Sequence, residues 1–183
     1  WYRYFLDWCD TFPSPPPGEL DPLKQPGLVY VWRDMQIAWR LMVLIHSVAL
    51  LAARPGALAP EQWGRIYRMI EDHAGRVCGE ARKQLPKEPG GRVPFNHFLH
   101  KGAALIYAGV LYPEFAGAEE WVEVGRQAVH EYNRQHTYSD GGSEEACPSY
   151  SHFISRCHLD ACVLLDTNGR RAVPGLRRSI VKQ

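Results

Sequence analysis

The sequence has little of what marks membrane or nucleic-acid-binding proteins. Its 21 Lys and Arg residues nearly balance 20 Asp and Glu residues, giving a formal net charge of +1. No charge excess of one sign therefore predicts nucleic acid or a membrane surface as the partner. The densest apolar stretch, residues 37–53, is interrupted by Arg40 and His46, and falls short of the ~18 uninterrupted apolar residues of a membrane span.

Cysteine occurs in a number and spacing that fit neither a zinc motif nor a disulfide framework. The count is five, which is odd, and the chain contains no CxxC. We expect buried free thiols, which mildly favour a reducing compartment but leave the localisation open. The five are Cys9, Cys78, Cys147, Cys157 and Cys162.

Strand signals are nearly absent, and helical periodicity dominates the chain. Six prolines within residues 11–27 predict an irregular connector there. The pattern predicts an all-α fold of antiparallel helical hairpins, forming a single helical domain over residues 1–183. The expected helices cover residues 29–53, 60–77, 96–110, 116–132 and 144–165.

The ends of the sequence suggest a piece of a longer protein. With 183 residues, 45% of them hydrophobic and 22% charged, the chain can form one domain with a core. It starts at Trp1 with no leader pattern, and a new helical pattern begins at residues 176–183. We therefore expect further residues beyond this fragment.

Two segments carry residue types suited to chemistry. Asn96 and His97 stand at the start of one predicted helix. Tyr150 follows a predicted turn that contains Gly141 and Gly142. An amide can donate hydrogen bonds to a carboxylate without taking up its proton, and histidine titrates near neutral pH. A phenol can protonate a departing alkoxide.

Five elements occur in order along the second half of the chain: Asn96-His97, Tyr112-Pro113-Glu114-Phe115, Trp121 with Gly125, Asp140-Gly141-Gly142, and Glu145 with Tyr150. Together they resemble the N-terminal helical domain of the heparinase II/III-like polysaccharide lyases, which include heparin/heparan sulfate and alginate lyases. The resemblance is clearest over residues 96–165 and looser upstream. The resemblance implies part of an incomplete (α/α) toroid, whereas periodicity alone supports only helical hairpins.

The resemblance also implies catalytic roles for Asn96, His97 and Tyr150. Asn96 would neutralise a uronate carboxylate, His97 would assist or act as the base, and Tyr150 would protonate the leaving oxygen. Each has a structural alternative, because Asn96 suits a helix cap and a lone histidine or tyrosine is often a core residue. We expect His97 and Tyr150 to face one concave surface, with the Asn96 amide beside them.

Glu145, His100 and Gly142 are the candidate substrate-binding residues. Glu145 would orient a sugar hydroxyl or a catalytic group, or else stabilise the first turn of a helix. His100 lies one helical turn after His97, and Gly142 allows close approach of backbone to a ligand. No third ligand is spaced to join the two histidines, so we expect neither a metal nor another cofactor. Family members often carry a histidine where this chain has Ser151, which leaves the role of His152 open.

The leading hypothesis is a lyase domain that cleaves uronic-acid-containing glycans, of the heparan sulfate/heparin or alginate type, by β-elimination. Its partner would be an anionic polysaccharide or oligosaccharide, which a local basic cleft can bind despite the small net charge. The family site also uses residues from later domains, so this chain would hold only part of it. A non-catalytic carbohydrate-binding or scaffold domain is the alternative. A toroid glycoside hydrolase using Asp140 and Glu145 is the third possibility.

Overall fold

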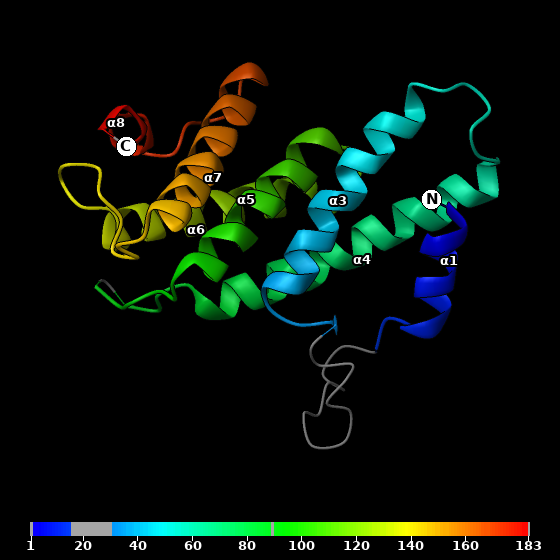
Figure 1. Ribbon diagram of the computed structural model, residues 1–183, viewed down its shortest axis with the longest axis horizontal. Coiled ribbons are helices and arrows are strands. Elements are labelled where there is room, and N and C mark those ends of the chain that lie inside the picture. The colour runs from blue at the N-terminus through cyan, green and yellow to red at the C-terminus, as the bar shows by residue number, and fades with distance from the viewer. Residues whose placement is uncertain (1, 16–30, 89, 183) are drawn as a thin grey trace.

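The computed structural model describes residues 2–15, 31–88 and 90–182. Within these ranges the chain is all-helical, apart from one isolated antiparallel bridge between Thr137 and Ser143. The helices, labelled in Figure 1, are α1 (Tyr2–Thr11), α3 (Met35–Ala52), α4 (Pro60–Gln84), α5 (Asn96–Leu111), α6 (Ala118–His136), α7 (Pro148–Thr167) and α8 (Leu176–Lys182).

Helix α5 is the centre of the fold. It packs against α3, α4, α6 and α7, and lies between α3 and α7 in Figure 1. Thirteen of its 16 residues are buried, including Phe98, Leu105 and Ile106. A helix that is apolar on nearly every face must be covered on every face, and this accounts for its position.

Helix α3 is long and strongly apolar. By length and composition it is the one helix of the described part that could cross a bilayer, with a mean hydropathy of 1.6 despite Arg40 and His46. Six of its 18 residues, among them Ile37 and Leu41, are buried, and the helix packs against α4 and α5. The remaining residues, among them Trp39, Val43 and Leu50, are partly or fully exposed.

The hairpin of α5 and α6 depends on glycine at the crossing. A Cβ built on Gly125 would lie 2.7 Å from the carbonyl oxygen of Gly102, and one on Gly109 would lie 2.4 Å from that of Ala118. Both separations are shorter than real carbon–oxygen contacts. The two backbones can therefore approach this closely only because no side chain intervenes.

Two predicted helix starts were wrong. Helix α3 begins at Met35, because Asp34 has a positive φ of 58° that a helix cannot include. Helix α7 begins at Pro148, because Ala146 has a φ of 50° and proline suits the first turn. The sequence also gave no prediction for α1. Most of the predicted connector, from residue 16 onward, lies outside the described residues.

Gly125→Ala should destabilise the protein by about 1–3 kcal/mol, because the added methyl group forces α5 and α6 apart. Gly79→Ala in α4 is the matched control, since no atom lies within 4 Å of the position that an added Cβ would occupy. Removing a mid-helix glycine there should raise stability by up to ~1 kcal/mol. Urea unfolding followed by circular dichroism measures both, and equal effects of the same sign would contradict the close crossing.

Candidate functional site

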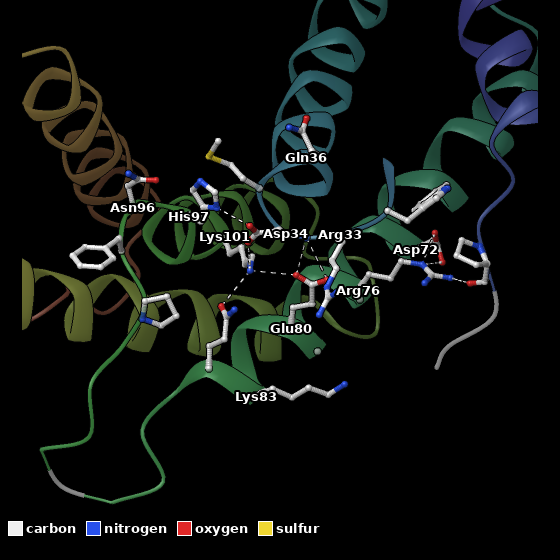
Figure 2. Close-up of a pocket in the computed structure, with 18 of the residues that line it drawn as sticks. Arg33, Asp34, Gln36, Asp72, Arg76, Glu80, Lys83, Asn96, His97 and Lys101 are labelled. Carbon is white, nitrogen blue, oxygen red and sulfur yellow. Dashed lines mark hydrogen bonds and ion pairs between the residues drawn. The ribbon is translucent and has the colours of Figure 1, made fainter. Parts of the chain in front are cut away.

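A cavity of about 1650 Å³ opens where α3, α4 and α5 begin or end. Its wall comes from residues 32–36 before and at the start of α3, from the α4 face between Asp72 and Gln84, and from residues 94–101 with Glu145. Figure 2 shows charged side chains from all three parts directed into the same space. Segments distant in sequence thus form one polar site.

Asn96 is the first residue of α5, and its side chain is not used as a helix cap. The N-cap position belongs to Phe95. The Asn96 amide instead donates a hydrogen bond to Glu145 Oε1 at 2.8 Å, and its backbone N–H approaches the same oxygen at 3.4 Å. The side chain is nearly buried at 7% exposure. Glu145 therefore fixes the amide where it lines the cavity.

Glu145 does not belong to the first turn of α7, so the alternative that it is a first-turn residue of that helix was wrong; its carboxylate lies instead at the start of α5. It lies in the turn that connects α6 to α7, three residues before Pro148. That turn is attached to the rest of the site by His136, whose ring nitrogens contact Glu144 Oε2 at 2.5 Å and the Val93 carbonyl at 3.1 Å. The hydrogen bond from His136 holds the pKa of the Glu144 carboxyl below its ordinary value.

His97 stands on the cavity wall with one ring nitrogen engaged. Its Nδ1 lies 2.6 Å from Asp34 Oδ2, and about half of the side chain is exposed. Nε2 has no polar partner among the described residues. The imidazole is therefore oriented from one side and accessible from the other (Figure 2).

Lys101 and Asp34 are site residues that sequence reasoning missed. The Lys101 side chain is 1% exposed, and its ammonium contacts Asp34 Oδ1 at 2.8 Å, Glu80 Oε2 at 3.2 Å and Gln84 Oε1 at 3.2 Å. Burial raises the pKa of the Asp34 carboxyl, but hydrogen bonds from Lys101 and His97 outweigh this and lower it overall. A single lysine inside the apolar run of α5, one turn after His97, was the available signal.

Tyr150 lies on a second, smaller cavity. It is the third residue of α7 and is 46% exposed. This cavity, of about 240 Å³, is also lined by Met35, Trp39, Asn96, Ser149 and Phe153. Asn96 and Met35 line both cavities, so they stand between the His97 side and the Tyr150 side. His97 and Tyr150 thus line adjoining cavities and not a single one.

Two of the predicted substrate-binding residues line neither cavity. His100 is buried beneath the rings of Trp39 and Phe153, at centroid distances of 4.5 and 5.4 Å. Burial, with a smaller contribution from His97, lowers its pKa to about 4, so it is uncharged at neutral pH. Gly142 belongs to the turn after α6, where its N–H donates to Asp140 Oδ1 at 2.9 Å. Substrate contact by these two residues finds no support in the geometry.

The cavity combines paired and unpaired charges. Lys101 is paired with Asp34 and Glu80, and Arg76 with Asp72. Arg33 and Lys83 also line it and are exposed, and neither forms an ion pair with another described residue. Among the described residues these two cations are thus left unpaired in the cavity. Among the described residues there is no group of three His, Cys, Asp or Glu that could hold a metal ion.

The chain matches a known protein family over most of its length. The family described as the heparinase II/III N-terminus matches residues 1–175. The chain belongs to this family. The chain has the all-helical fold that periodicity predicted, in the toroid-type arrangement that the family resemblance implied.

Curated relatives are heparin-sulfate lyases. The chain is 26% identical over 121 residues to that of Bacteroides stercoris, covering 66% of this chain and 16% of the relative. It is 23% identical over 150 residues to that of Pedobacter heparinus, covering 82% and 20%. It is 25% identical over 170 residues to that of Bacteroides thetaiotaomicron, covering 92% and 21%. The chain thus spans about a fifth of the length of these relatives.

Solved structures share the fold. A heparinase III superposes with a TM-score of 0.73 at 22% identity, covering all of this chain and 28% of the other. The heparan sulfate lyase of Pedobacter heparinus gives 0.69 at 18% identity, covering all of this chain and 26% of the other. At these identities the similarity establishes the fold alone.

Glu145→Ala should destabilise the protein by about 1–3 kcal/mol, because the nearly buried Asn96 amide loses its acceptor. Glu145→Gln keeps an acceptor oxygen and should cost less than ~1 kcal/mol. Thermal unfolding of both variants at pH 7 measures the difference. If the two variants lose equal stability, the hydrogen bond to Asn96 does not hold the turn to α5.

Proposed function

We propose that the protein containing this chain is a polysaccharide lyase that cleaves uronic-acid-containing glycans of the heparan sulfate/heparin type by β-elimination. The observation that carries the proposal is the position of Asn96 between two adjoining cavities. His97 lines one of them and Tyr150 the other. A uronate bound at Asn96 would have a histidine on one side and a phenol on the other.

The reaction requires three events at neighbouring atoms. The uronate carboxylate accepts hydrogen bonds from the Asn96 amide, which stabilises the negative charge that develops when the adjacent carbon loses its proton. His97 or the Tyr150 phenolate takes that proton. The electron pair forms the carbon–carbon double bond, the glycosidic carbon–oxygen bond breaks, and the Tyr150 hydroxyl protonates the leaving oxygen.

The charges of the larger cavity suit an anionic substrate. The single ammonium of Lys101 is shared by the carboxylates of Asp34 and Glu80, whereas Arg33 and Lys83 are exposed without an ion pair to a described residue. Uronate or sulfate groups can bind these two cations without displacing an ion pair among the described residues. The two cations favour an anionic glycan over a neutral one.

A non-catalytic carbohydrate-binding role is the second candidate, and one observation favours it. The Asn96 amide, which the lyase reaction requires, is already bonded to Glu145 Oε1 at 2.8 Å and is nearly buried, as a structural asparagine would be. The glycoside hydrolase alternative has less support. Asp140 accepts a hydrogen bond within its own turn and lines neither cavity, so it does not pair with Glu145 across a substrate.

The assay that separates these functions measures ultraviolet absorbance of the unsaturated product, whose new carbon–carbon double bond is conjugated with the carboxylate. The full-length protein should generate it from heparan sulfate or heparin. Alginate and hyaluronan are tested in parallel. Binding on a glycan array without any new absorbance would favour the carbohydrate-binding role and contradict the lyase.

Tyr150→Phe in the full-length protein should lower kcat by ~10²–10⁴-fold, the usual contribution of a general acid. KM should change little, because the lost proton is needed only in the transition state. Tyr138→Phe is the matched control, since Tyr138 is exposed and lines neither cavity. Near wild-type turnover of Tyr150→Phe would remove Tyr150 from the catalytic residues.

A further inference from the structure

Asp34 occupies an unusual backbone position immediately before α3. Its φ of 58° and ψ of −138° are rare for a residue with a side chain. An aspartate at a helix N-cap normally accepts a hydrogen bond from the first turn, but Asp34 makes no such bond. Its backbone N–H donates to Glu80 Oε2 at 3.1 Å. The strained conformation therefore directs the carboxylate away from its own helix.

The carboxylate is held between two donors of α5. Oδ1 accepts from Lys101 at 2.8 Å and Oδ2 accepts from His97 at 2.6 Å. His97 and Lys101 are four residues apart and so share one face of the helix. The Lys101 ammonium is itself fixed by Glu80 and Gln84. Asp34 is thus oriented by a fully buried cation.

We propose that Asp34 is a positioning residue for His97. Its carboxylate, anchored by Lys101, requires a proton on His97 Nδ1 and thereby leaves Nε2 for the ligand in the cavity. A neutral His97 then presents the Nε2 lone pair as a base, and a protonated His97 presents Nε2–H to a carboxylate. Carboxylates that contact a catalytic imidazole act in this way by fixing tautomer and ring orientation.

The inference rests on the proposed function only for its effect on turnover. The tautomer of His97 is a property of the protein itself. It can be read without a substrate, from the ¹⁵N chemical shifts and long-range ¹H–¹⁵N couplings of the full-length protein labelled at histidine. His97→Gln identifies the signal by its disappearance.

Asp34→Asn should reverse the tautomer. Lys101 has only donors, so it should retain the amide oxygen of the new side chain. The amide NH₂ group then faces His97 Nδ1, which must accept and so loses its proton to Nε2. We expect neutral His97 to be the Nδ1–H form in the wild type and the Nε2–H form in the variant. Turnover should fall by ~10²-fold or more with little change in KM.

Asp72→Asn is the matched control, because Asp72 lines the same cavity but pairs with Arg76 and not with His97. Its His97 signal should stay in the Nδ1–H form. The wild-type spectrum is decisive even if Asp34→Asn does not fold. A neutral His97 in the Nε2–H form in the wild type would overturn the inference. An unchanged tautomer in folded Asp34→Asn also overturns it. Absence of lyase activity on every uronate polymer would reject the proposed function. The role of Asp34 would still be tested by the His97 tautomer in the spectra.

Discussion

One buried ammonium group determines how the parts of the site meet. Lys101 projects from the central helix into a position with 1% exposure. An unpaired charge there would be very costly, and removing one partner of such a pair typically costs ~3–5 kcal/mol. The three acceptors come from Asp34 before α3 and from Glu80 and Gln84 on α4. The ammonium therefore connects three helices at one end of the larger cavity.

Neighbouring residues at the start of α5 contact different parts of the site. Lys101 faces inward to the ion pairs, and His97, one turn earlier, shares Asp34 with it. Asn96 is turned to the other side, where Glu145 holds its amide. The first turn of the helix therefore joins the polar cavity to the smaller cavity beside Tyr150. Further along α5, glycine at the crossing lets the helix pack closely against α6.

The sequence predicted the helices well because their apolar periodicity is strong. The predicted helix starts were wrong where local backbone geometry, and not apolar periodicity, sets the first residue of a helix. The positive φ values of Asp34 and Ala146 delay the starts of α3 and α7, and neither residue is one that periodicity singles out. The family resemblance indicated Asn96, His97 and Tyr150 as candidate residues, and their catalytic roles remain predictions. The roles of Asp34 and Glu80 could not be foreseen, because their contacts with α5 arise only from tertiary packing.

The proposed reaction depends on a uronate that binds at Asn96, between the cavities of His97 and Tyr150. A crystal structure of the full-length Tyr150→Phe variant with an uncleaved heparan sulfate oligosaccharide would show where the uronate lies. We expect a uronate carboxylate about 3 Å from the Asn96 amide nitrogen, with the sugar chain extending into both cavities. An oligosaccharide bound elsewhere, or an Asn96 amide that contacts only Glu145 while substrate is present, would contradict it.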